Sequence, residues 1–109
     1  MILDASVTSK YTRVEFDADK KEYEIRPVDQ YGVVASIRFQ DGAVKEAGVN
    51  GCFVEDVLAV AIHRLQALDR GLPSHYNEVA VRHLFAAQGA LNARTAERLE
   101  RGVAGTSKK

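Results

Sequence analysis

Residues 54–101 decide the fold, and they read VEDVLAVAIHRLQALDRGLPSHYNEVAVRHLFAAQGALNARTAERLER. In the first part of this stretch, apolar residues recur at steps of three and four, as one face of a helix requires: Val54, Leu58, Ala61, Leu65 and Leu68. Gly71 and Pro73 are expected to end this helix. A short connection follows, and short connections join antiparallel neighbours. The stretch therefore predicts a helical hairpin.

The second helix is predicted to run from Asn77, a plausible N-cap, to about Arg101, where Gly102 stops it. At about 1.5 Å per residue, a helix of roughly 25 residues is about 37 Å long. Such a helix overshoots its partner by several residues, and the overshoot carries the arginines.

One face of the second helix begins apolar and then turns cationic: Leu84, Ala87, Leu91, Arg94, Arg98 and Arg101. An arginine side chain can grip a phosphate with two hydrogen bonds and can stack on a base, so this helix end is expected to capture an anion. The alternative is a solvated helix end, whose cations simply complement the helix dipole.

Hydrophobicity alternates with a period of two before residue 50, which is typical of strands. Strands are predicted at 11–16, 22–26 and 33–40, and residues 43–49 would return from an Asp41-Gly42 hairpin turn. A strict two-residue turn there sets Arg38 opposite Lys45. The predicted class is α+β in a single domain over residues 1–109. It has a small antiparallel sheet at about 10–49, a long antiparallel helical hairpin at about 52–102 and a flexible tail at 103–109.

The composition bounds the function. The chain has 109 residues, with fifteen basic and fifteen acidic side chains, so its cations are local and suit a small anion better than a long nucleic acid. Cys52 is the single cysteine, and the three histidines lack the spacing of metal ligands. No catalytic constellation stands out, so we expect no enzyme, no cofactor and no metal. Alanine and valine make thin cores, which favours a homo-oligomer.

Met1 to Leu3 is apolar, but Asp4 and a polar run follow at once, which argues against a secretory signal. No stretch of the sequence is apolar over the length that spans a bilayer. The sequence thus predicts a soluble cytosolic protein without a membrane partner.

Two stretches resemble signatures of one phage protein family. They are residues 39–52, FQDGAVKEAGVNGC, and the C-terminal pattern of Arg94-Thr95, Arg98 and RGVAGT at 101–106. Ile62-His63-Arg64-Leu65 and residues 77–84 fall between them in the expected order. The family is that of the bacteriophage Thoeris anti-defence sponges, which share a helical hairpin with a phage sponge against the CBASS system. The resemblance covers roughly residues 33–106.

The resemblance implies sequestration without chemistry. Its ligand would be glycocyclic ADP-ribose, the signal made by bacterial TIR-domain defence enzymes, in the cytoplasm of the infected host. It also implies dimers or hexamers that hold cyclic di- or trinucleotides at a separate site. By position, Asn77 and Arg94 match the family's ligand-contacting residues, while Arg98 and Arg101 match its arginine-rich end.

The sequence departs from the family at the hairpin turn. Leu68 stands where the family commonly has an aromatic residue that stacks on the base, and the loop at 71–77 is one residue shorter. Two readings of Tyr76 stay open, because it can replace the missing ring or pack against the end of the hairpin. Arg38 and Lys45 are the candidates for the second, cyclic-oligonucleotide site.

Two other classes of protein compete with this reading. A small oligomeric phage structural or assembly protein needs the same hairpin but no nucleotide. A nucleic-acid binder can use the arginine end together with Lys108 and Lys109, although the zero net charge argues against it.

Overall fold

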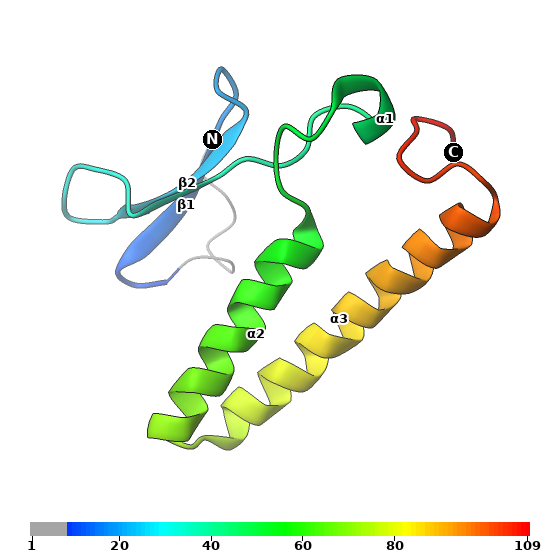
Figure 1. Cartoon of the computed structure of the whole chain (residues 1–109). Helices are drawn as coiled ribbons and strands as arrows, with labels where there is room; N and C mark the ends of the chain where they lie inside the picture. Colours follow the sequence, from blue (N-terminus) through cyan, green and yellow to red (C-terminus); the bar gives the residue numbers. More distant parts are fainter. Residues whose placement is uncertain (1–8) are drawn as a thin grey trace. The chain divides into compact units, whose positions relative to one another are not determined.

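A computed structural model of the chain describes residues 9–109. The chain divides into two compact units. The sheet unit holds the described residues up to Gln40 together with Asn50–Cys52, and the hairpin unit holds Asp41–Val49 and Phe53–Lys109. A small antiparallel sheet followed by a helical hairpin confirms the predicted α+β class (Figure 1). The prediction that residues 1–4 do not begin a secretory signal concerns residues outside the described range. The single domain also stays a prediction.

The sheet unit has three antiparallel strands in the order β1-β2-β3. They are β1 (Thr12–Asp17), β2 (Glu22–Pro27) and β3 (Ala35–Ile37), and the first two confirm the predicted strands to within a residue. Phe16 lies opposite Tyr23 and Tyr23 opposite Ile37, so the alternation places apolar side chains on one face. The rings of Phe16 and Tyr23 lie 4.9 Å apart.

The other face of the sheet carries paired charges. Arg13 donates to Glu15 over 2.7 Å, and Arg26 donates to Glu24 over 3.2 Å. Glu24 is 7 % exposed, and Arg26 supplies the opposite charge that compensates this buried carboxylate. The hydrogen bond from Arg13, helped by the charges of Arg13 and Arg26, holds the pKa of Glu15 below its usual value.

The predicted strand at 43–49 is wrong, and so is its pairing with residues 33–40. Residues Val44–Ala47 form a short helix, α1, and β3 pairs with β2 instead. The chain beyond β3 bridges to Cys52, with hydrogen bonds from Cys52 N to the Arg38 carbonyl and from Gln40 N to the Cys52 carbonyl, each 2.9 Å long. The approach needs glycine at 51, because a Cβ there would lie 2.5 Å from the Phe39 carbonyl group.

The hairpin unit contains the two long helices, which lie side by side and antiparallel in Figure 1. They are α2 (Val54–Gly71) and α3 (His75–Glu100). Ile62 on α2 is the most deeply buried apolar side chain of the described residues, at 6 % exposed. The apolar stripe around it is only half-buried, so this unit has a thin core. Within residues 9–109, no helix has both the length and the apolar character needed to cross a membrane.

The N-cap of α3 is Ser74 rather than Asn77. The Ser74 hydroxyl accepts a hydrogen bond from the Tyr76 backbone N–H over 3.2 Å, and the helix begins at His75. Both residue types are good N-caps, and the first one after Pro73 takes the position. Asn77 lies in the first turn.

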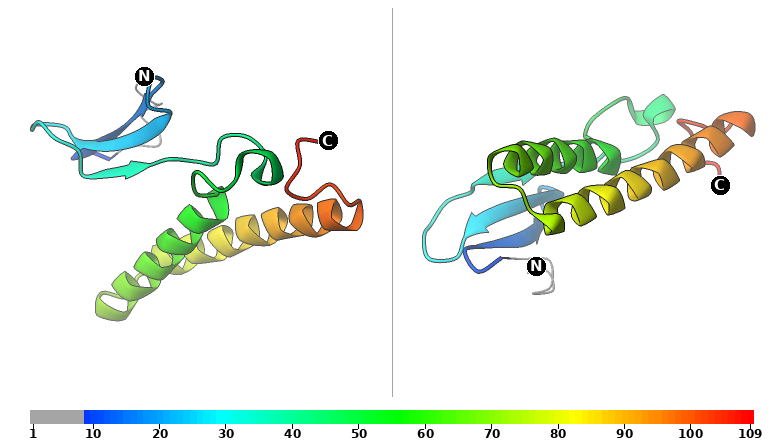
Figure 2. Two further views of the ribbon diagram at one scale, coloured as in Figure 1. Left: turned by 45° about the horizontal axis from the view of Figure 1, so that its top comes forward. Right: turned by 90° about the horizontal axis from the view of Figure 1, so that it is seen from below.

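The predicted overshoot is confirmed. Helix α3 has 26 residues against 18 for α2, and in both views of Figure 2 it runs past the start of α2. Arg94 and Arg98 lie on this last part of α3, and Arg101 is its C-cap.

Candidate ligand-binding site

A pocket of about 310 Å³ lies where α3 overshoots, and we call it the arginine pocket. It is built by four segments of the hairpin unit, namely α1, the start of α2, the end of α3 and the C-terminal loop (residues 102–107). Its lining residues are Val44, Phe53, Glu55, Arg94, Thr95, Arg98, Ala104 and Gly105. Its size is at the lower end of the range of small-molecule sites.

Arg94 is the free cation of this pocket. It is exposed, and within residues 9–109 its guanidinium makes no hydrogen bond or ion pair. An unpaired arginine keeps all five N–H donors for an anion, with no internal partner to displace. The alternative hypothesis of a solvated helix end explains why Arg94 is exposed, but it does not explain why Arg94 lines a pocket.

Arg98 and Arg101 are already engaged. One Arg98 nitrogen donates to the Val103 carbonyl over 3.2 Å and to the Thr106 carbonyl over 3.1 Å. Arg101 pairs with Glu97 over 3.0 Å and also donates to the Lys109 carbonyl. Of the three predicted arginines, the structure therefore leaves Arg94 alone without a partner among the described residues.

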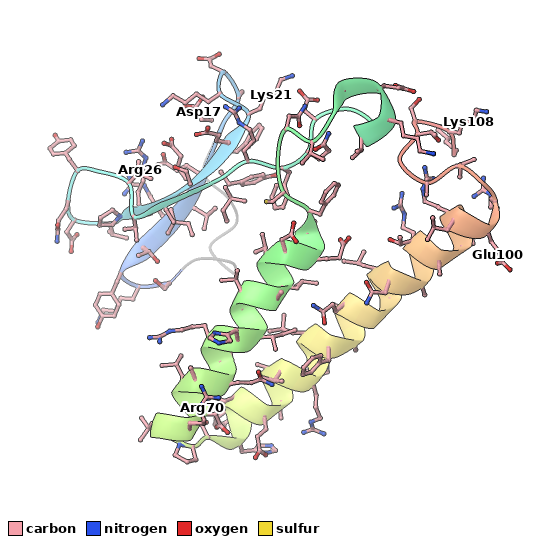
Figure 3. All side chains as sticks on the ribbon, in the orientation of Figure 1. Asp17, Lys21, Arg26, Arg70, Glu100 and Lys108 are labelled. Carbon is pink, nitrogen blue, oxygen red and sulfur yellow. The ribbon has the colours of Figure 1, made fainter. Side chains whose placement is uncertain are left out.

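Residues 103–109, the predicted flexible tail, include a loop that is hydrogen-bonded to α1. The Lys45 backbone N–H donates to the Gly105 carbonyl over 2.9 Å, and the Ser107 hydroxyl lies 3.1 Å from a Glu46 carboxylate oxygen. These bonds join the C-terminal loop to α1 and make it one wall of the arginine pocket. Figure 3 shows Glu100 and Lys108 at this end of the hairpin unit and Arg70 at the opposite end.

A second pocket of about 460 Å³ lies beside the hairpin turn, and we call it the turn pocket. Asn77 lines it together with Gln66, Asp69, Arg70, Glu78 and Val81. Tyr76 is 82 % exposed and Leu68 is 44 % exposed. The Tyr76 ring centroid lies 6.0 Å from that of the neighbouring His75, and its exposure shows that Tyr76 does not pack as a buried residue.

The two family-matched residues lie far apart in one chain. Asn77 and Arg94 sit on the same helix, and a rise of about 1.5 Å per residue separates them by roughly 26 Å. No nucleotide-sized ligand reaches both residues of one chain.

Arg38 and Lys45 do not form the predicted facing pair. Arg38 belongs to the sheet unit, where it donates to Glu22 over 3.1 Å and to the Lys20 carbonyl over 3.4 Å. Lys45 belongs to α1 of the hairpin unit. The predicted β-hairpin would place Arg38 opposite Lys45, but residues Val44–Ala47 form the helix α1 instead of its second strand.

Sequence reasoning missed Phe53, Glu55 and the C-terminal loop as parts of a site. Gly102 is recognisable in the sequence as a helix stop, but a stop does not reveal that the loop after it returns to α1. No group of three or more metal-ligating side chains occurs in the described part of the chain.

Comparison with known proteins identifies the family. The model of a family described as the Acb2/Tad1 hairpin domain matches residues 32–96, which include Asn77 and Arg94 and end before Arg98. The chain is also 43 % identical over 82 residues to the protein "Thoeris anti-defense 1" of Bacillus phage SBSphiJ7. That match covers 74 % of this chain and 58 % of the relative, so the chain spans little more than half of the relative's length. The chain therefore belongs to the Acb2/Tad1 hairpin-domain family, which confirms the resemblance to the Thoeris anti-defence proteins.

Proposed function

We propose that this protein binds and sequesters a cyclic nucleotide immune signal, glycocyclic ADP-ribose above all, and does not degrade it. The single observation that carries the proposal is Arg94, an unpaired arginine in a pocket, at a position inside the family-matched segment. A phage anti-defence role follows from the family, and the cytoplasm of the infected host is where such a signal is met.

The arginine pocket has the chemistry that a cyclic ADP-ribose needs. Arg94 offers a cation for the phosphates, and the Thr95 hydroxyl lies beside it in the same lining. Phe53 lines the pocket and is 40 % exposed, so an aromatic face is available to a base. Phe53 thus offers at this end of the hairpin the ring that Leu68 does not supply at the turn.

A complete site needs a second chain. Arg94 and Asn77 both match ligand-contacting residues of the family, yet they lie about 26 Å apart on one helix. If the α3 helices of two chains lie antiparallel to one another, Asn77 of the partner subunit comes beside Arg94. Tyr76 of the partner subunit and Leu68 of the partner subunit then lie near the same ligand. The exposed apolar side chains Val60, Phe85 and Leu99 support such an assembly as a homo-oligomer, either a dimer or a hexamer.

Sequestration asks for affinity rather than catalysis. A trap has to outcompete the host effector, and nanomolar binding corresponds to about −12 kcal/mol. Among the described residues that line the arginine pocket, Glu55 is the one carboxylate and none is a histidine, so the lining offers no carboxylate–histidine pair for general acid–base hydrolysis.

Calorimetric titration with glycocyclic ADP-ribose, a cyclic dinucleotide and a cyclic trinucleotide tests the proposal. We expect tight binding of the first, and chromatography after denaturation should return it unchanged. An altered ligand would make the protein an enzyme. No heat with any of the three would favour the alternative that the chain is a structural or assembly protein, a role that the exposed apolar side chains also suit.

For the second, cyclic-oligonucleotide site, Arg38 of the sheet unit and Lys45 of the hairpin unit are proposed as two independent candidates, each tested by itself. Arg38→Ala and Lys45→Ala should each weaken trinucleotide binding, and Arg38→Ala should leave glycocyclic ADP-ribose binding unchanged. If neither change alters trinucleotide binding, both residues are removed from the site.

A further inference from the structure

The C-terminal loop begins with a tight reversal at the end of α3. Gly102 has a φ of 72°, and the Gly102 N–H donates to the Leu99 carbonyl over 3.1 Å. The Val103 N–H donates to the Arg98 carbonyl over 3.0 Å. This pair of bonds is the Schellman motif, which turns the chain back along the last helical turn. Val103 is thereby brought within reach of the Arg98 side chain.

The Arg98 guanidinium then ties the loop together. Its Nη2 donates to the carbonyls of Val103 and Thr106, which are the first and last residues of a turn. The Thr106 N–H closes that turn on the Val103 carbonyl over 3.1 Å. Gly105 has a φ of 74° at the third position, which suits a type II turn. Arg98 is half-buried here, and within residues 9–109 its guanidinium forms no ion pair with an acidic side chain.

The tied loop docks on α1 through Gly105 and Ser107. The Gly105 carbonyl accepts from the Lys45 N–H, and Ser107 bonds to Glu46. A Cβ at Gly105 would lie 3.2 Å from Lys45 Cγ, so the loop approaches α1 closely at this point. Ala104 and Gly105 consequently stand in the wall of the arginine pocket.

We propose that Arg98 is a positioning residue, whose guanidinium holds the C-terminal loop as a wall of the pocket that Arg94 faces. Arg98 retains the bound nucleotide by keeping this wall closed, rather than by gripping its phosphate. The inference rests on the proposed function and assigns Arg98 a different role from Arg94. Arg98 lies beyond the family-matched segment, which ends at residue 96.

The two roles differ in kinetics. A wall that must open before the ligand leaves controls the dissociation rate, whereas a cation that attracts a phosphate also raises the association rate. Arg98→Lys keeps the charge and loses the planar fork that reaches both carbonyls. Gly105→Val keeps Arg98 intact but strains the positive φ and pushes Lys45 away. Both changes should loosen the same wall.

The test is a double-mutant cycle on the full chain, with rates of glycocyclic ADP-ribose binding measured by stopped flow. We expect Arg98→Lys and Gly105→Val each to raise koff about tenfold with little change in kon. The double variant should be no worse than either single variant, because the two changes act on one element. Gly32→Val also strains a positive φ, but in the sheet unit, and as the matched control it should leave koff unchanged. Additive losses, or a Gly105→Val variant with normal koff, would overturn the proposal.

Amide hydrogen exchange of the free protein separates this proposal from the proposed function. The amides of Lys45 and Thr106 should be protected in the wild type and lose protection in Arg98→Lys. Protection that survives the substitution would show that Arg98 does not hold the loop, whatever the ligand does. If the wild-type protein binds none of the three nucleotides, the proposed function fails, and the exchange result alone decides whether Arg98 anchors the loop.

Discussion

The side-chain amide of Asn77 on α3 donates a hydrogen bond to the Asp69 carboxylate on α2, over 3.4 Å. The same carboxylate oxygen accepts from the Ser74 backbone N–H over 2.9 Å. Since a carboxylate only accepts, this bond orients the amide nitrogen of Asn77 toward Asp69 and leaves its carbonyl oxygen to accept from elsewhere. Asn77 can therefore accept from a ligand N–H or hydroxyl through this oxygen, and its second amide N–H can still donate.

Asp69→Ala should weaken both the hairpin turn and ligand binding. The change removes the acceptor of two hydrogen bonds, which costs about 1–3 kcal/mol of unfolding free energy. Urea denaturation measures the stability, and calorimetry measures the affinity. Asp69→Asn keeps an acceptor oxygen and should recover most of the stability. Normal ligand affinity in Asp69→Ala would show that it does not orient Asn77.

Ser74→Ala should destabilise the hairpin by about 1 kcal/mol, because it removes the N-cap of α3. Asn77→Ala should have a smaller effect on stability, since Asn77 is not the cap. Urea denaturation of the two variants compares them directly. Equal losses of stability would argue that Asn77 supports the helix start as much as Ser74 does.

Glu55→Gln should tighten the binding of an anionic ligand, because Glu55 places a negative charge in the lining of the arginine pocket. At low salt the gain should be several-fold, on the order of 1 kcal/mol, and it should shrink as ionic strength rises. Asp56→Asn is the matched control. It removes the same charge one residue along, outside that lining, and keeps an oxygen for the bond from the Phe53 N–H. A Glu55→Gln variant with weaker binding would instead make the Glu55 carboxylate a ligand contact, as an acceptor for ribose hydroxyls.

The sheet unit should lose stability in acid through Glu15. The Arg13 hydrogen bond lowers the pKa of Glu15 in the folded state below its ordinary 4.5. A lowered folded-state pKa stabilises the fold above the unfolded value, and this stabilisation is lost as pH falls through the folded value. An NMR titration of the Glu15 carboxyl should show a midpoint below 4.5, and Arg13→Ala should move it upward. An unchanged midpoint in Arg13→Ala would contradict the assigned cause.

The long helices could be predicted because their apolar period repeats over many turns, from Val54 through Leu91. Residues 43–49 could not, because so short a run fits both periods: Val44 and Ala47 are one helical step apart, whereas Ala47 and Val49 alternate as strand residues do. The sequence also contains no sign that the chain after β3 bridges at Phe39 to Cys52 rather than to residues 43–49. That pairing depends on the close approach of Gly51 to Phe39.

The candidate site was predictable in part for a similar reason. Helical spacing and the family resemblance both point to Arg94, and the structure leaves it unpaired in a pocket. The same spacing cannot tell Arg94 from Arg98 and Arg101. Their difference arises from backbone carbonyls of the C-terminal loop and from Glu97, which are tertiary and local partners that a face of a helix does not reveal.

The most direct test of the central claim compares Arg94→Ala with Arg82→Ala in calorimetric titration with glycocyclic ADP-ribose. Arg82 is an exposed arginine on the same helix and lies outside the lining of both pockets. Loss of a charge-assisted pair with a phosphate costs about 1.5–3 kcal/mol, so Arg94→Ala should weaken binding by roughly ten- to a hundredfold. Arg82→Ala should bind as the wild type does. Equal affinity in Arg94→Ala and the wild type would contradict the claim that Arg94 captures the ligand.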